Sequence, residues 1–289
     1  MLIGCAWLIA RLPLSTIESL GTRLGHLTWR LAKSRRLITE TNIAKCFPQL
    51  DADAQQQMVR DSFAELGVGS LDLMIPWLNP KRDLRDRMQV IGLEHLEAAH
   101  AEGRGVVVVG AHYAVIDVIS QPLSDIGFMD VMYRANKNEV WEWLQVTGRQ
   151  RYFDGVIERK DMRQILRCLK KGRAIWYAAD QDYGRKHSVF AEFFGNTAAT
   201  ITATSRLAKV NNSPVVLMRQ SRSPGMRWQI QFYPAVDNFP TEDEVADATR
   251  MNALLEDLIR LHPAQYLWQH KRFKTRPLDE DTPFYPPGA

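Results

Sequence analysis

A histidine and an aspartate that could do acid–base chemistry follow a short apolar run. Residues 106–110 read Val-Val-Val-Val-Gly, and a β-branched run between glycines is typical of a strand buried on both faces. His112 comes next in the predicted loop, and Asp117 follows five residues later, across a stretch predicted as the first turn of a helix. Because a carboxylate can fix the tautomer of an imidazole and stabilise its protonated form, His112 is predicted to be a general base that Asp117 orients.

This spacing also occurs by chance, and the alternative is a loop histidine that caps a helix beside an unrelated surface carboxylate. The position favours a functional site, because open α/β sheets bind ligands beyond the carboxyl ends of their strands. The ring nitrogen that the carboxylate does not hold is then free to take a proton from a substrate.

Strands and helices alternate through most of the chain, which predicts an α/β fold with a largely parallel sheet flanked by helices. Asp180 stands at the end of one predicted strand, as His112 does after another, so both side chains are predicted to face one crevice. The alternative for Asp180 is a structural ion pair with an arginine. The predicted strands are residues 88–91, 106–110, 128–133, 156–157, 174–179, 214–218 and 228–233, and the predicted helices are residues 15–33, 51–66, 92–101, 139–147, 162–171, 200–209 and 243–261.

Length and composition indicate a folded protein with a sizeable core. The 289 residues, 45% of them hydrophobic, could form one large domain or two small ones. Three cysteines, at positions 5, 46 and 168, are too few and too scattered for a disulfide framework or a Cys-x-x-Cys metal site, which suits a reducing compartment. The sequence contains no Gly-x-Ser-x-Gly nucleophile motif, no His-Glu-x-x-His zinc motif and no phosphate-binding loop with a Gly-Lys pair.

Positive charge is concentrated in two parts of the chain. Residues 134–173 hold eleven Lys and Arg against five Asp and Glu, a net of +6, whereas the whole chain has a net charge of +4. Residues 271–276 add four basic residues and no acidic one. This distribution predicts a polyanionic partner. No nucleic-acid-binding motif is present, so a phosphorylated lipid headgroup or an acidic carrier protein is favoured, with a solvated basic face as the alternative.

Several stretches resemble a known family. Gly-Ala-His-Tyr-Ala-Val-Ile-Asp (residues 110–117) resembles the H-x4-D/E block of the glycerolipid acyltransferase superfamily. Further stretches, at residues 133–138, 148–151, 158–161, 176–184 and 268–277, resemble the lipid A biosynthesis (late) acyltransferases of Gram-negative bacteria, the lauroyl/myristoyl type. The similarity runs from about residue 35 to residue 277. Many members carry Glu at the position of Asp117, whereas the wider superfamily uses Asp, which weakens assignment to one subfamily.

The resemblance implies a glycerolipid-acyltransferase-like fold and an acyltransferase activity. The enzyme would take a fatty acyl chain from acyl carrier protein and add it to the hydroxyl of a 3-hydroxyacyl chain on a lipid A precursor of the Kdo-lipid IVA type. His112 would act as general base for direct attack on the thioester, and no metal or other cofactor is implied. The alternatives are a relative acting on lysophosphatidic acid or another lipid acceptor, and a non-catalytic membrane-surface protein.

The resemblance also carries four substrate-binding residues over to this chain. Arg149 and Asp180 match family positions tied to activity, and Arg134 and Arg159 match motif positions whose role is less defined. Arginine suits a phosphate group because its planar guanidinium donates two parallel hydrogen bonds and keeps its charge. These residues are therefore expected to bind the acceptor or the donor.

The N-terminal 33 residues are expected to attach the protein to the inner membrane, with the acyltransferase domain (residues 34–277) on the cytoplasmic side and a loose tail at residues 278–289. Residues 1–10 are apolar but end at Arg11, too short to span a membrane, which takes about 20 residues. Either the true start lies upstream or the segment inserts into one leaflet. Residues 15–33 combine apolar residues at helical spacing with basic ones, as an interfacial helix requires. The alternatives are a buried core helix and an ordinary packed amphipathic helix.

Overall fold

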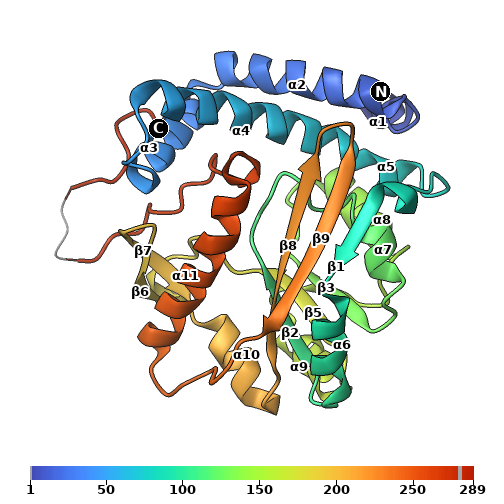
Figure 1. Ribbon diagram of the computed structural model, residues 1–289, viewed down its shortest axis with the longest axis vertical. Helices are drawn as coiled ribbons and strands as arrows, with labels where there is room; N and C mark the ends of the chain where they lie inside the picture. Colours follow the sequence, from blue (N-terminus) through green and yellow to red (C-terminus); the bar gives the residue numbers. More distant parts are fainter. Residues whose placement is uncertain (1, 279–281) are drawn as a thin grey trace.

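The computed structural model describes residues 2–278 and 282–289, and within them a sheet of seven strands runs through the centre (Figure 1). These strands are β1 (Met88–Ile91), β2 (Val106–Gly110), β3 (Met129–Tyr133), β4 (Val156–Glu158), β5 (Ala174–Ala178), β8 (Val215–Ser223) and β9 (Arg227–Ala235). They lie in the order β1-β9-β8-β2-β5-β3-β4. β8 and β9 are antiparallel, whereas the other neighbouring strands are parallel. The predicted α/β fold with a largely parallel sheet is confirmed.

Helices cover both faces of the sheet. Successive side chains of a strand point to opposite faces, so one strand can contribute to two buried clusters. In β2, Val107 and Val109 belong to one buried hydrophobic cluster, and Val106 and Val108 belong to the other. Helices α9 (Met162–Lys170), α10 (Ala203–Asn211) and α11 (Glu244–Leu261) contribute to the first cluster, whereas α6 (Leu93–Ala101) and α7 (Ser120–Ser124) contribute to the second. Burial on both faces explains why the apolar run of β2 does not alternate with polar residues.

Two long helices, α2 (Leu14–Leu31) and α4 (Ala52–Asp72), lie side by side across the end of the sheet toward which β8 points (Figure 1). Their backbones approach closely at glycines, since a Cβ atom on Gly67 would lie 2.1 Å from the carbonyl oxygen of Gly21. A side chain there would push the two helices apart. The shorter helices α3 (Lys33–Cys46) and α5 (Met74–Leu78) continue this layer.

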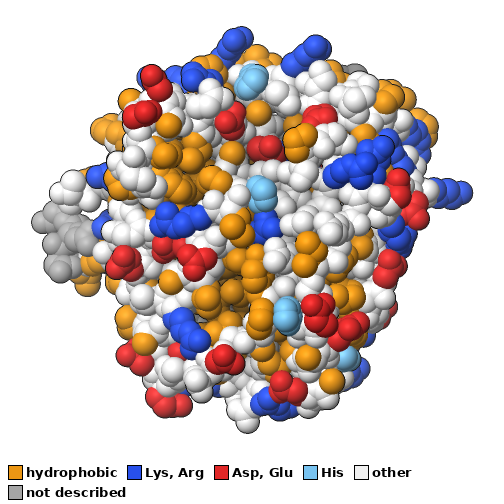
Figure 2. All heavy atoms as spheres, viewed as in Figure 1, with side chains coloured by type: hydrophobic (Ala, Val, Ile, Leu, Met, Phe, Trp, Pro, Cys, Tyr) orange, Lys and Arg blue, Asp and Glu red, His pale blue; other side chains and the backbone are white. Residues whose placement is uncertain are grey.

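The N-terminal helices present apolar side chains to solvent. α1 (Leu2–Ile9) is short, and among residues 2–278 and 282–289 no helix combines the length and the apolar character needed to cross a membrane. On α2, Leu20, Leu24, Leu27 and Leu31 are 39%, 41%, 50% and 73% exposed. Figure 2 shows Lys and Arg side chains along the upper edge of the molecule, where Figure 1 places α2. The interfacial role of this segment and the domain boundary after residue 33 stay predictions.

One hairpin was not predicted. β6 (Ser188–Phe193) and β7 (Asn196–Ile201) form an antiparallel pair that is joined by Phe194 and Gly195, both with positive φ. Residue 200 was predicted to begin a helix, but it pairs with Val189 in this hairpin, and α10 begins only at residue 203. The apolar and threonine-rich sequence of β7 suits a strand once β6 lies beside it. Pairing between strands, rather than local sequence, decides this segment.

The predicted loose tail is docked where the structure describes it. The Tyr285 hydroxyl donates to Oδ1 of Asn42 at 2.8 Å and accepts from the backbone N–H of Phe273 at 3.1 Å. The ring of Phe284 stacks on that of Phe273, with centroids 4.5 Å apart. The prediction is therefore wrong for residues 282–289, whose aromatic side chains join the core, while residues 279–281 lie outside the described part.

Candidate functional site

His112 and Asp180 meet where two neighbouring strands end. β2 and β5 are parallel partners with Gly110 opposite Ala178, so the residues that follow them share one edge of the sheet. Nδ1 of His112 lies 2.7 Å from Oδ1 of Asp180, and the backbone N–H of His112 donates to the same oxygen at 3.1 Å. Asp180 is buried, whereas the side chain of His112 is 25% exposed. With Nδ1 held by the carboxylate, Nε2 is the ring nitrogen that is left to exchange a proton.

The surroundings of Asp180 keep it ionised. Burial by itself would raise the pKa of this carboxyl group. The nearby His112 ring, the hydrogen bonds from its side chain and backbone, and a hydrogen bond from the Tyr266 side chain outweigh burial and lower the pKa to about 2. Burial and the negative Asp180 in turn raise the pKa of Tyr266 well above its usual value, so its hydroxyl stays a donor. Asp180 is therefore a negatively charged carboxylate in contact with Nδ1 of His112.

The predicted pairing of His112 with Asp117 is wrong. Residues 111–119, called here the His112 loop, are not the first turn of a helix, and α7 begins only after them. Asp117 lines a pocket together with Trp176, which belongs to one hydrophobic cluster, whereas Tyr266 beside Asp180 belongs to the cluster on the other face. In the described part of the chain no hydrogen bond joins the two predicted partners. The loop carries His112 and Asp117 to different sides of the sheet edge.

Asp117 instead binds the arginine that was predicted to contact substrate. Nε and Nη2 of Arg149 donate to the two carboxylate oxygens of Asp117, at 2.7 and 3.0 Å. The side chains are 11% and 6% exposed, so this charged fork fixes the end of α8 (Glu139–Arg149) to the His112 loop. The pocket beside the pair has mainly apolar walls, which include Ile116, Ile119, Leu123, Val131, Phe153, Trp176 and Met218.

A C-terminal segment that no sequence motif marked holds the His112 loop in place. The carbonyl oxygen of His112 accepts from the backbone N–H of Leu267 at 2.9 Å, and the N–H of Ala114 donates to the carbonyl of Gln265 at 2.7 Å. The side chain of Gln265 in turn donates to and accepts from the backbone of Arg222 on β8, at 2.6 and 2.9 Å. Residues 265–267 thus act as a strap across the loop. Because the bonds between the strap and the loop join the backbones of distant segments, composition alone could not indicate them.

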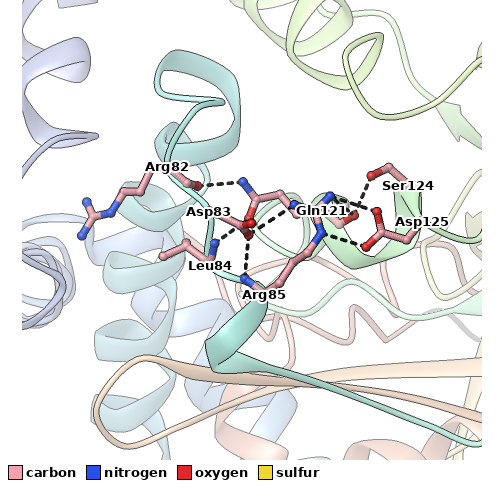
Figure 3. Close-up of polar contacts among 7 residues, drawn as sticks. All are labelled: Arg82, Asp83, Leu84, Arg85, Gln121, Ser124 and Asp125. Carbon is pink, nitrogen blue, oxygen red and sulfur yellow. Dashed lines mark hydrogen bonds and ion pairs between the residues drawn. The ribbon is translucent and has the colours of Figure 1, made fainter.

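The far end of the loop is fixed through α7 (Figure 3). The side-chain amide of Gln121 donates to the carbonyl of Arg82 at 2.7 Å and accepts from the N–H of Leu84 at 2.9 Å. Arg85 donates to both oxygens of Asp125, at 2.7 and 2.9 Å. The backbone of α4 packs closely against the loop, since a Cβ atom on Gly69 would lie 2.1 Å from the carbonyl oxygen of Ala114. The loop is therefore supported on several sides, as a preorganised site requires.

The other two predicted residues lie at the same edge of the sheet, farther from His112. Arg134 follows β3 and is exposed, and Arg159 follows β4. The guanidinium of Arg159 lies 4.7 Å from the ring centre of Tyr183, and its Nη1 atom is buried without a hydrogen-bond partner in the described part of the chain. Within the central sheet, β3 and β4 lie beyond β5 as seen from β2. The structure thus brings the predicted residues to one edge but pairs only His112 with Asp180, and Asp117 with Arg149.

A second histidine lies behind the site. Burial, the His112 ring and the nearby Lys274 and Arg272 lower the pKa of His270 to about 4, although Asp180 acts in the opposite direction. The neutral ring of His270 accepts a long hydrogen bond, 3.4 Å, from the backbone N–H of Asp182. Among the described residues, no group of three or more His, Cys, Asp and Glu side chains is arranged to hold a metal ion.

Known proteins resemble this chain over nearly its whole length. Residues 1–275 match the profile of the bacterial lipid A biosynthesis acyltransferases. The chain is 36% identical to the lipid A biosynthesis lauroyltransferase of Escherichia coli (strain K12), with 95% of this chain and 90% of that protein covered. It is 37% identical to the palmitoleoyltransferase of the same organism, with 97% and 92% covered. The corresponding values for the myristoyltransferase are 28%, 96% and 86%.

These matches confirm the resemblance that the sequence motifs indicated. The profile covers both paired sites described above, His112 with Asp180 and Asp117 with Arg149. The identity to the first two relatives is high enough, over enough of each chain, to establish common membership. The protein therefore belongs to the bacterial lipid A biosynthesis acyltransferase family and is an acyltransferase.

Proposed function

We propose that the protein transfers a fatty acyl chain from acyl carrier protein to the hydroxyl group of a 3-hydroxyacyl chain on a lipid A precursor of the Kdo-lipid IVA type. The observation that best supports this proposal is the buried carboxylate of Asp180, 2.7 Å from Nδ1 of a histidine whose side chain is 25% exposed. Such a pair is built to take a proton from an alcohol. The printed names of the relatives support lipid A chemistry.

In the proposed reaction, Nε2 of His112 removes the hydroxyl proton while the oxygen attacks the thioester carbonyl carbon. The imidazolium that forms is stabilised by ionised Asp180, which already accepts from Nδ1. The tetrahedral intermediate then expels the carrier thiolate, and the C–S bond breaks as the new C–O ester bond is kept. His112 returns its proton to the thiolate. No acyl-enzyme intermediate is involved, and His112 ends each cycle neutral.

Asp117 and Arg149 have a supporting role in this proposal. Their buried pair sets the shape of the His112 loop, while Nη1 of Arg149 has no partner in the described part of the chain and can donate to a substrate oxygen. The apolar walls beside the pair enclose only about 20 Å³, the space of about one water molecule. Arg134 and Arg159, at the same edge of the sheet, are proposed to bind anionic groups of the acceptor or donor.

The reaction can be tested with purified protein. We expect it to convert a lipid A precursor that has free 3-hydroxyacyl groups into a product heavier by one acyl chain when a lauroyl acyl carrier protein is supplied. Mass spectrometry of the lipid would measure the product, with His112→Ala as the inactive control. Lysophosphatidic acid serves as the competing acceptor. Acylation of that lipid alone, or equal product from the His112→Ala variant, would contradict the proposal.

The protein is further proposed to sit on the inner membrane through α1 and α2, with the acyltransferase domain on the cytoplasmic side. Exposed apolar residues on α1, with Trp7 and Leu8 at 45% and 60%, continue the exposed leucines of α2. Arg23 and Arg30 are exposed on α2, and Arg11 lies over the ring of Trp7. An outward apolar face with basic neighbours is the pattern of a helix that lies in a membrane interface containing anionic lipid.

A triple substitution on α2 tests this attachment. Leu24→Glu, Leu27→Glu and Leu31→Glu together are expected to reduce binding to phosphatidylglycerol-containing vesicles at least about tenfold, because each buried leucine is worth about 1.5–3 kcal/mol. Flotation with the vesicles measures the bound fraction. The matched control changes three aliphatic residues exposed elsewhere, Val245, Leu261 and Leu278, to Glu and should bind normally. Equal flotation of both variants would refute docking through α2.

A further inference from the structure

Helix α9 carries an exposed row of basic side chains. Its inner face, Ile165, Cys168 and Leu169, is buried in the hydrophobic cluster on one side of the sheet. Its outer face presents four exposed basic residues at the spacing of one helical stripe, Arg163, Arg167, Lys170 and, directly after the helix, Lys171. These four residues are called here the α9 basic row. No acidic residue follows Asp161, which caps the helix, until after residue 173.

The α9 basic row has no internal counter-charge. None of its four residues forms an ion pair in the described part of the chain. On the neighbouring α10, by contrast, Arg206 and Lys209 are paired with Glu244 and Glu242. Two of the four residues, Lys170 and Lys171, lie at the C-terminal end of α9, where positive charge interacts favourably with the helix dipole.

Arg163 does not gain from the helix dipole, because it lies in the first turn, where positive charge is unfavourable. It also repels Arg167, four residues on, and like charges at that spacing destabilise a helix. The row therefore does not serve the stability of α9. A surface that keeps such charges exposed is suited to an external anionic partner.

The position of α9 favours a protein partner over a membrane. Figure 1 places α2 at one end of the molecule and α9 toward the opposite end, and the exposed leucines belong to α2. The apolar face of α9 is buried in the core. Among the described residues of this helix, Met162 is the single large hydrophobic one that is exposed. An interfacial helix needs an apolar face turned outward. The α9 basic row instead faces the aqueous phase, where an acidic protein helix could lie against it.

We infer that the α9 basic row is the docking surface for the acidic acyl carrier protein that delivers the thioester. This inference rests on the proposed function, since it assigns the surface for its donor. α9 directly follows β4, and the carboxyl end of β4 lies at the edge of the sheet that also holds His112 and Asp180. α9 leads from that edge back to the start of β5, so Arg163 is the residue of the row nearest the edge, and a carrier docked along the row would extend its thioester past Arg163 toward His112. Complementary charge of this kind acts on encounter and orientation, not on the chemical step.

The experiment compares two donors and two charge-reversed variants. The α9 variant carries Arg163→Glu, Arg167→Glu and Lys170→Glu, and the matched control carries Lys45→Glu, Lys81→Glu and Arg227→Glu, which are exposed basic positions elsewhere. With lauroyl acyl carrier protein, the α9 variant is expected to show a KM raised at least about tenfold with kcat unchanged, while the control stays near wild type. With lauroyl-pantetheine, which has no protein part, both variants should match wild type.

Ionic strength gives a second readout. Raising the salt concentration should increase the KM of the wild type for the carrier donor and should have little effect on that of the α9 variant. An α9 variant with the same carrier KM as the control would overturn the inference, as would an equal loss with both donors or a loss of vesicle flotation alone. A wild-type enzyme that uses lauroyl-pantetheine but not the carrier thioester would instead show that the proposed donor itself is wrong.

Discussion

Replacing Asp180 with asparagine is expected to lower kcat/KM for acyl transfer by about 10³- to 10⁴-fold. The amide of asparagine can donate to Nδ1 of His112, which would place the ring proton on Nε2 and leave no lone pair there to accept a proton from the alcohol. It also removes the negative charge that stabilises the imidazolium. Initial rates with saturating and limiting acceptor would measure the effect, and the loss should appear mainly in kcat.

The control for this variant is Asp154→Asn, whose carboxylate is 82% exposed and should be dispensable for transfer. His112→Ala combined with Asp180→Asn should be no worse than His112→Ala alone, because the two residues act as one unit. An Asp180→Asn enzyme within about tenfold of wild type would contradict the proposed role, since general-base assistance contributes about 10²–10⁴.

The pH dependence of this effect follows from the lowered pKa of Asp180. The folded-state pKa is about 2, below the usual value of 3.8, so the ionised carboxylate contributes stability above about pH 4 that is lost as the pH falls through 2. In the neutral range of an activity assay Asp180 does not titrate. The rate loss in Asp180→Asn should therefore be the same throughout that range.

Replacing Arg149 with methionine is expected to destabilise the fold by about 3–5 kcal/mol, because it leaves the buried carboxylate of Asp117 without a partner. The two residues share two hydrogen bonds at 2.7 and 3.0 Å and are nearly enclosed. Urea unfolding would measure the loss. Activity should fall as well, since the pair fixes the shape of the His112 loop.

The matched variant removes both charges at once. Asp117→Asn with Arg149→Met should regain much of the lost stability, because a neutral pair of similar volume leaves no uncompensated charge in the interior. The double-mutant cycle separates the pair from the rest of the site. If Arg149→Met alone costs less than about 1 kcal/mol, the range of an exposed ion pair, the pair does not hold the loop.

The sequence predicted that the site lies at the carboxyl ends of β2 and β5, but it did not predict that His112 is bound to Asp180. The valine run of β2 and the apolar run of β5 each show a buried strand, and the polar residue after each strand predicts a shared crevice. That Asp180 lies against His112 depends on β5 being the neighbour of β2, with β3 and β4 displaced outward. Strand order is a long-range property that periodicity does not contain. Asp117 is the carboxylate nearer to His112 in the sequence, and it was therefore predicted as the partner.

Two other contacts could not be predicted either, because they too join segments that are far apart in the sequence. Asp117 and Arg149 were each singled out, yet their bond joins a loop to the end of a helix 32 residues later. The strap at residues 265–267 works through backbone hydrogen bonds, which any residue type can make. The elements themselves were predictable where the hydrophobic period was clear, as on α2 and α9.

The proposed catalytic pair is tested most directly by a measurement that identifies the carboxylate bound to Nδ1 of His112. Nuclear magnetic resonance on protein with isotope-labelled histidine can report the protonation of each ring nitrogen. We predict a proton on Nδ1, in a strong hydrogen bond, that Asp180→Asn abolishes and Asp117→Asn preserves. The opposite result, with the signal lost only when Asp117 is replaced, would contradict the central claim that Asp180 and His112 form the catalytic pair.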